Sequence, residues 1–195
     1  MQHIKEGEYS AKQLMVWLEN EAKQANDYID CVLNDYDHTP HFSEHFNNVL
    51  QVNNYTYARW PQGDLYKATY GQQGIYVFIV NADFQLSGKE VNDYCEKCNG
   101  AGFYVRGKKA LLKGQRFYQG STIRSLHCRI REHYSEYSSN SALQLNNPNR
   151  IIVKDKLTLF LFPVVPSLKR YPFFIRMIES EMHYRHKALT GNKRT

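Results

Sequence analysis

The sequence predicts an α+β protein in which a small, mainly antiparallel three-stranded sheet is flanked by helices. Three runs rich in β-branched and aromatic residues predict the strands: GIYVFIVNAD at 74–83, RFYQGS at 116–121 and DKLTLFLFPVV at 155–165. Stretches with apolar residues at helical spacing lie before and after these runs and predict the flanking helices. The first two strands can pair as antiparallel neighbours, with residues 88–115 as a long excursion between them.

The N-terminal third predicts an acidic helical region. One amphipathic helix is expected over 10–34, with Ser10 suited to cap its N-terminus. Its apolar stripe consists of Leu14, Leu18, Ala22, Ala25, Ile29 and Val32 or Leu33. A second short helix is expected at 43–50, and 55–64 is interpreted as irregular chain or a short edge strand.

The excursion between the first two strands contains two different segments. Residues 88–102 predict a short helix whose apolar face carries Val91, Tyr94, Cys95 and Cys98, and Gly100 is placed to end it. Because a structural zinc site needs four ligands, core packing is the better interpretation of the two cysteines, and no structural zinc is expected. Residues 103–115 are interpreted as a basic hairpin or flexible loop. Its cationic side chains, with that of the following strand, are Arg106, Lys108, Lys109, Lys113 and Arg116, and they are expected to grip nucleic-acid phosphates.

Two helices are expected after the second strand. The apolar stripe of the first consists of Ile123, Leu126, Ile130, Tyr134 and Tyr137. Arg129 and His133 lie four residues apart beside that stripe, so their side chains are neighbours on one face. A last helix is expected over 169–189, with Pro172 near its first turn. Its buried face holds Phe174, Ile178 and Met182, and Glu179 lies at the margin of that face.

Charge is distributed unevenly along the 195 residues. The formal net charge is +6, but residues 1–103 carry 7 Lys and Arg against 14 Asp and Glu, whereas residues 104–195 carry 18 against 5. A half-chain this basic favours a polyanionic partner, and nucleic acid is the commonest one. Arg124 is a further candidate for contact with it. No apolar run is long enough to span a bilayer and the N-terminus lacks a signal peptide, so a cytoplasmic protein without a membrane partner is expected.

Five side chains could form a catalytic set where the two strands and two helices meet. They are Tyr76, Tyr118, Arg129, His133 and Glu179. Arginine matches the planar geometry of a phosphate and can stabilise its developing charge. A single carboxylate can hold Mg²⁺ while water and phosphate complete the coordination shell. Together these residue types suit phosphodiester hydrolysis.

The order of these residues resembles the GIY-YIG nuclease superfamily over roughly residues 72–193. The matching features are GIY at 74–76, YQG at 118–120, the Arg129 and His133 pair, and a late Glu followed by Asn192. The resemblance implies a nuclease domain at 72–195, preceded by an extension at 1–71. Gly74, Gly120 and Asn192 would support the site.

The resemblance also implies a role for each candidate. Tyr76 would be the general base, and Tyr118 would bind the scissile phosphate or support the attacking water. Arg129 would stabilise the transition state, and His133 would assist proton transfer or position the nucleophile. Glu179 would hold the one divalent ion, Mg²⁺ or Mn²⁺, with Glu181 as the competing ligand.

Three features depart from the family pattern. The middle letter of the second motif is the polar Gln119, the helix Arg lies one residue later than in many members, and 41 residues separate the motifs. Residues 84–115 are therefore interpreted as an insertion.

The expected function is a divalent-metal-dependent DNA endonuclease. Because the chain ends three residues after Asn192, a free-standing restriction-type or mobile-element enzyme is favoured, and a homodimer is a further expectation. The alternative is a catalytically inactive nucleic-acid-binding protein on the same scaffold, and the choice between DNA, RNA and branched substrates stays open.

Overall fold

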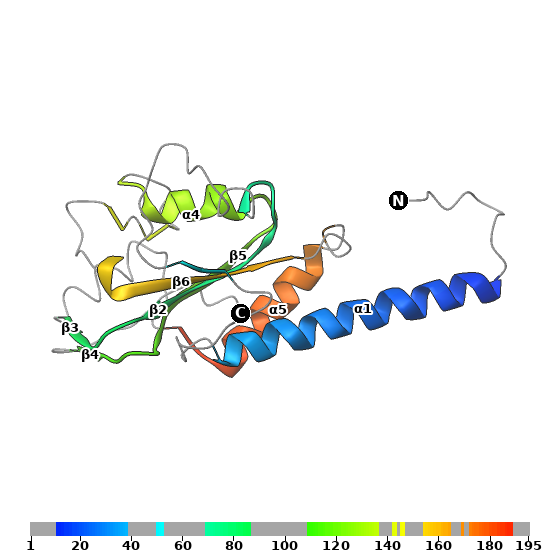
Figure 1. Cartoon of the computed structure of the whole chain (residues 1–195), viewed down its shortest axis with the longest axis horizontal. Helices are drawn as coiled ribbons and strands as arrows, with labels where there is room; N and C mark the ends of the chain where they lie inside the picture. The colour runs from blue at the N-terminus through cyan, green and yellow to red at the C-terminus, as the bar shows by residue number, and fades with distance from the viewer. Residues whose placement is uncertain are drawn as a thin grey trace.

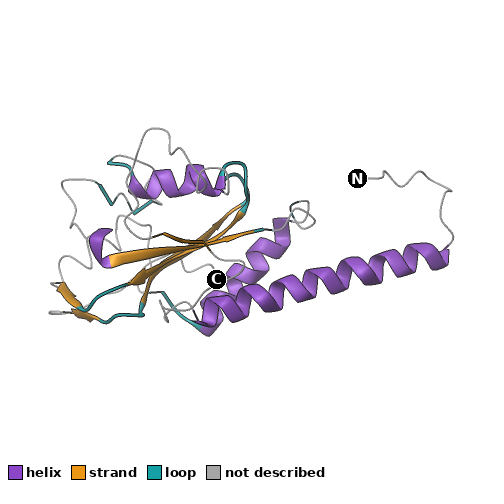
Figure 2. Cartoon of the chain, in the orientation of Figure 1, coloured by secondary structure: helices purple, strands orange, loops and turns teal. Residues whose placement is uncertain are grey.

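The computed structural model has α+β architecture, as the sequence predicts. It describes residues 11–38, 50–52, 69–86, 109–136, 142–143, 145–146, 154–164, 169 and 172–188. Within them, three α-helices flank a four-stranded sheet, and two further short strands pair as a second sheet at one end of it (Figures 1 and 2). The helices expected at 43–50 and 88–102 and the segment 55–64 lie outside the described residues, apart from Leu50.

The main sheet has the strand order β1-β6-β2-β5, and every neighbouring pair is antiparallel. Its three long strands are β2 (Gly74–Val80), β5 (Arg116–Thr122) and β6 (Leu157–Pro163), which confirms the three strands expected from the sequence. The short strand β1 (Leu50–Val52) pairs with β6 and adds a fourth. Because β5 is the last strand in this order, its far edge is where side chains from both faces of the sheet can meet.

All seven residues of β2 are buried because helices cover both faces of the sheet. On one face, Tyr76, Phe78 and Val80 pack with Leu126 and Ile130 of α4 (Leu126–Tyr134). On the other face, Ile75, Val77 and Ile79 pack with side chains of α1 (Ala11–His38) and α5 (Pro172–Arg185). The alternation along one strand therefore separates two apolar layers.

The N-terminal helix belongs to the same core as the sheet. Tyr28, Val32 and Tyr36 of α1 are buried in the layer that holds Ile175 and Met182 of α5. With β1 completing the sheet as well, packing crosses the boundary expected near residue 71. The other half of α1 extends beyond the sheet and the two other helices (Figure 1).

One local expectation is corrected by the structure. Ile123 is not part of the α4 stripe: Ser125 caps the helix through its side chain, so α4 begins at Leu126, and Ile123 is exposed in the turn before it. In the insertion, β3 (Phe84–Leu86) pairs with β4 (Lys109–Leu111), so this part is a strand pair.

None of the helices in the described ranges combines the length and the apolar sequence needed to cross a bilayer.

Candidate functional site

Tyr76 lies at the centre of the candidate site. It is opposite Gly120 in the pairing of β2 with β5, and its ring extends across β5. A Cβ atom added to Gly120 would lie 2.6 Å from the Tyr76 hydroxyl oxygen and 2.9 Å from the ring carbon that bears it. Glycine is therefore required at 120 because the phenol rests on the backbone there. The Tyr76 side chain is 1% exposed.

The glycine of the first motif has a similar steric cause. A Cβ atom on Gly74 would lie 2.4 Å from the backbone oxygen of Phe162 and 2.7 Å from a methyl carbon of Leu126. The missing side chain lets β6 and the start of α4 approach β2 closely. Both candidate support glycines thus act by allowing close packing, one beside α4 and one beneath Tyr76.

Two donors from α4 converge on the Tyr76 oxygen. Arg129 donates from Nε at 3.0 Å, and the His133 Nε2 lies at 3.1 Å. The tautomer of His133 follows from its other nitrogen, because the backbone N–H of Leu143 donates to Nδ1 at 3.1 Å. Nδ1 is an acceptor, so the proton is on Nε2 and His133 donates it to Tyr76. The phenolic oxygen therefore accepts two hydrogen bonds.

The ionisation of the three groups follows from burial and from the Arg129 charge. Burial, reinforced by Tyr118, raises the pKa of Tyr76 well above 10, although the charge and hydrogen bond of Arg129 lower it. Burial, and then the neighbouring Arg129 charge, lower the pKa of His133 well below 6.5. Burial opposes the charge of Arg129, but Tyr76 and Glu132 still raise its pKa above the ordinary value. At neutral pH the site holds a neutral phenol, a neutral imidazole and a guanidinium ion.

Tyr118 lies beside Tyr76 on the same face of the sheet. Its ring is stacked on that of Tyr76, with centroids 6.2 Å apart and planes 18° apart, and its centroid lies 5.0 Å from that of His133. Tyr118 is 5% exposed. Both tyrosines of the motifs therefore lie on the α4 face of the sheet and contact the same histidine.

Glu179 approaches from the opposite face. It lies on α5, and Ser121 of β5 donates from Oγ to its Oε2 at 2.5 Å. The carboxylate is buried, and its charge is one of the causes that raise the pKa of Tyr76. The two groups therefore interact electrostatically around the edge strand. Glu181 instead pairs with Arg185 at 2.9 Å and is half-exposed, so it does not share this environment.

Arg129 has a second partner that the sequence reasoning missed. Its Nη1 forms an ion pair with Glu132 at 2.5 Å, and the two side chains are 18% and 45% exposed. A phosphate that binds Arg129 would therefore lie beside Glu132 or take its place. The spacing of three residues on one helix is the sequence signal that could have revealed this pair.

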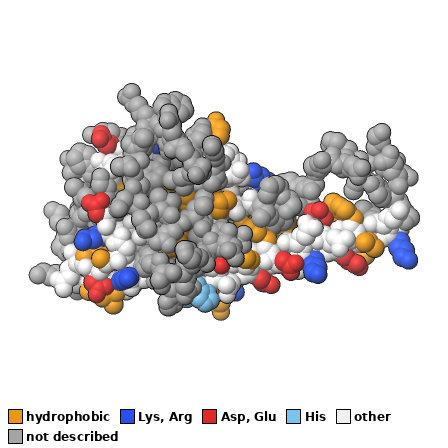
Figure 3. Space-filling model, in the orientation of Figure 1, with side chains coloured by type: hydrophobic (Ala, Val, Ile, Leu, Met, Phe, Trp, Pro, Cys, Tyr) orange, Lys and Arg blue, Asp and Glu red, His pale blue; other side chains and the backbone are white. Residues whose placement is uncertain are grey.

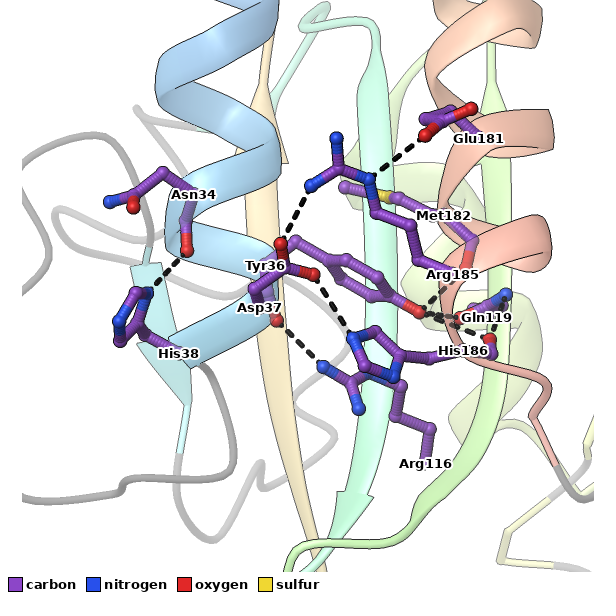
Figure 4. Close-up of polar contacts among 10 residues, drawn as sticks. All are labelled: Asn34, Tyr36, Asp37, His38, Arg116, Gln119, Glu181, Met182, Arg185 and His186. Carbon is purple, nitrogen blue, oxygen red and sulfur yellow. Dashed lines mark hydrogen bonds and ion pairs between the residues drawn. The ribbon is translucent and has the colours of Figure 1, made fainter.

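The other face of β5 binds the C-terminal end of α1 (Figure 4). Figure 4 shows the Tyr36 side chain pointing between β5 and α5, where its hydroxyl donates to Gln119 Oε1 at 2.7 Å and approaches the Met182 oxygen at 3.1 Å. Gln119 in turn donates to the His186 oxygen at 3.3 Å. The polar middle letter of the YQG motif is thus explained by docking of α1.

Arg116 also belongs to this α1 contact and corrects an expectation. It is 8% exposed, donates to the Tyr36 backbone oxygen at 2.9 Å, and its guanidinium lies 4.4 Å from the centre of the Tyr36 ring. Burial is the main cause that lowers its pKa. A guanidinium held in this way packs helix against sheet, so Arg116 does not form part of a basic surface for nucleic acid.

Three of the remaining candidates for contact with nucleic acid lie within the described residues. Lys113 and Arg124 are exposed, and Lys109 begins β4. Lys108, Arg106, Asn192 and the pair Cys95 and Cys98 lie outside the described residues.

The residues present fit a divalent ion held by one carboxylate. Glu179 would supply the hard oxygen ligand that Mg²⁺ and Mn²⁺ prefer, and Ser121 donates a hydrogen bond to one oxygen of that carboxylate, as outer partners of metal ligands do. No three His, Cys, Asp or Glu side chains gather within the ranges that the structure describes, so a site with several protein ligands is not seen there.

Comparisons with known proteins found no relative: no protein-family model matches the chain, and neither a curated protein nor a solved structure does.

Proposed function

We propose that this protein is a divalent-metal-dependent nuclease that hydrolyses DNA phosphodiester bonds, as the resemblance to the GIY-YIG superfamily implies. The observation that carries the proposal is the Tyr76 oxygen, which is buried and accepts hydrogen bonds from both Arg129 and His133. Two fixed donors around one oxygen, one of them a guanidinium, favour a negative charge on that oxygen. Glu179, buried behind the same strand, is the candidate ion ligand.

The roles of the residues follow from their ionisation. Tyr76 starts protonated because burial raises its pKa, so it must first lose its phenolic proton to solvent before it can accept a proton from a water nucleophile. Further positive charge in the site would favour the phenolate that this step requires. A divalent ion on Glu179 would supply that charge and would also neutralise the phosphate. His133 is held as a donor by Leu143, so it orients Tyr76 and stabilises the phenolate.

Arg129 is the candidate phosphate ligand. Its side chain is partly exposed, and its Nη1 already binds the carboxylate of Glu132. A phosphodiester oxygen can take the place of that carboxylate, since guanidinium binds both anions in the same planar way. The guanidinium would then connect the phosphate to the Tyr76 oxygen.

Plasmid nicking in Mg²⁺ or Mn²⁺ tests the proposal, with DNA binding measured in parallel by fluorescence anisotropy. Arg129→Ala is expected to reduce the cleavage rate by about 10²–10³-fold. Arg131→Ala is the matched control, because Arg131 is an exposed cation on the same helix. Glu179→Gln should abolish cleavage, and Glu181→Gln should leave it unchanged.

Two outcomes would contradict the proposal. Tight DNA binding without cleavage in any divalent metal would replace the nuclease with a nucleic-acid-binding protein. Cleavage that survives Glu179→Gln but is lost in Glu181→Gln would move the ion to the other carboxylate. The proposed restriction-type or mobile-element role is tested by sequencing the ends of digested genomic DNA, which would reveal a recognition sequence.

A further inference from the structure

The distal half of α1 has an apolar face that continues beyond the rest of the fold. Among the α1 side chains whose burial the structure describes, Ala25 is the first that is buried. Residues 11–24 therefore form a projecting segment of about 21 Å at a rise of roughly 1.5 Å per residue. In this part Met15 is 55% exposed and Leu18 is 47% exposed. Figure 3 shows hydrophobic side chains among charged ones along the projecting helix.

The exposed residues belong to a regular pattern. One row at seven-residue spacing is Met15, Ala22, Ile29 and Tyr36, and a second row is Leu18, Ala25 and Val32. The rows alternate by three and four residues, which is the a and d pattern of a helix that packs lengthwise on another helix. Near the C-terminal end of α1 this seam packs on the sheet and α5, with Val32 1% exposed and Tyr36 0% exposed. Near the N-terminal end it is exposed.

A projecting helix with such a seam gains stability from a partner. Isolated helices of about 12–15 residues are marginal in water, because most helical stability in proteins comes from packing of the apolar face. The seam residues of the projecting part are Met15, Leu18 and Ala22, and all three are exposed. A second apolar helix is the occupant that this geometry fits.

The charges beside the seam favour a second copy of the chain as the partner, in antiparallel orientation. Lys12 and Glu19 both occupy the e position of the pattern in which Met15 is a and Leu18 is d. If a second copy lies antiparallel with Met15 opposite Leu18 of its partner, e positions face each other, and Lys12 of each copy lies beside Glu19 of the other. In a parallel copy each e position lies beside a g position of the partner, so Lys12 and Glu19 would not pair across the seam. The antiparallel arrangement is self-complementary, as a two-fold dimer requires.

We propose that the distal half of α1 is a dimerisation arm that pairs antiparallel with the same segment of a second copy of this chain. We expect a helix pair this short to bury less than the roughly 800 Å² per partner of a typical stable protein pair, and we expect a dissociation constant on the order of micromolar. The proposal is independent of the proposed function, because it concerns the chain without nucleic acid or metal.

Sedimentation velocity of the full chain over about 1–200 µM tests the arm. The chain should convert from monomer to dimer within this range. Leu18→Glu should weaken dimerisation at least about tenfold, because it puts a charge into the desolvated seam. Val16→Glu is the matched control, since Val16 is 50% exposed on the same helix but lies off the seam, and it should dimerise like the parent chain.

Charge exchange tests the direction of pairing. Lys12→Glu and Glu19→Lys should each dimerise more weakly than the parent, and an equimolar mixture of the two should restore dimerisation as a heterodimer. The double variant should also recover it. A chain that stays monomeric throughout the range, a Val16→Glu variant as defective as Leu18→Glu, or a mixture no tighter than its components would each overturn the proposal.

Discussion

The contact between Tyr76 and the backbone at Gly120 gives a quantitative prediction for Gly120→Ala. The added methyl would lie 2.6 Å from the hydroxyl oxygen and 2.9 Å from the adjacent ring carbon, both closer than Cβ atoms come to other heavy atoms in proteins. The phenol cannot rotate away without cost, because its ring is 1% exposed and its oxygen is bound by Arg129 and His133.

The expected cost has two parts. Forcing a methyl into a filled layer costs about 1–3 kcal/mol of unfolding free energy. Displacing the oxygen from the buried His133 donor costs about 1–3 kcal/mol more. Gly120→Ala should therefore destabilise the protein by roughly 2–6 kcal/mol in urea denaturation.

A double-mutant cycle with Tyr76→Phe isolates the hydroxyl. Removing the oxygen eliminates the 2.6 Å contact, so Gly120→Ala should cost about 1 kcal/mol less in the Tyr76→Phe background. Gly71→Ala is the control: Gly71 has a φ of 67° with nothing within 4 Å of an added Cβ, so alanine there is strained by backbone conformation alone. Its cost should be the same in both backgrounds. A coupling for Gly120 below about 0.3 kcal/mol would refute the placement of the Tyr76 hydroxyl over residue 120.

Three further predictions follow from the polar contacts. The folded-state pKa of His133 lies well below its unfolded value near 6.5, so the stability that the neutral imidazole contributes is present above that pH and is lost on acidification. His133→Gln should therefore flatten the loss of stability below pH 6.5. At neutral pH, ¹⁵N NMR of the imidazole should find the proton on Nε2. Ser121→Ala removes the donor to Glu179 and should weaken Mn²⁺ binding by about 10–100-fold in calorimetric titration. Ser121→Thr should retain the affinity. Unchanged affinity in the Ser121→Ala variant would show that Ser121 does not orient an ion ligand. Tyr36→Phe removes a donor from the buried Gln119 amide and should cost about 1–3 kcal/mol of unfolding free energy, and an equal cost in a Gln119→Leu background would contradict the bond between them.

The sequence predicted the strands well because each is a short run of β-prone residues with a buried pattern. It also predicted that Tyr76, Tyr118, Arg129 and His133 would gather near one edge, and the structure brings these four together. The prediction of α4 extended too far back because Ile123 fits the apolar period, whereas the cap at Ser125 decides where the helix begins. Periodicity alone does not report where a helix starts.

The contacts between segments that are distant in the chain could not be predicted. Leu143 fixes the tautomer of His133 from a polar loop, and Tyr36 binds Gln119 across 83 positions of sequence. The basic appearance of Arg116 in the sequence suggested a surface cation, because nothing local indicates that α1 covers it. Such pairings depend on how the helices dock on the sheet, and the spacing of residues along one element does not contain that information.

The four residues from Tyr118 to Ser121 show how one strand serves both faces of the protein. Tyr118 and Gly120 face α4: the Tyr118 ring stacks on the Tyr76 ring, and Gly120 leaves room for the Tyr76 hydroxyl. Gln119 and Ser121 face α1 and α5, where they bind Tyr36 and Glu179. Because these residues are consecutive in one strand, we expect a change in how α1 or α5 docks to shift the backbone on which Tyr76 rests. The polar Gln119, which departs from the GIY-YIG pattern that the sequence resembles, is the residue of this strand that contacts α1.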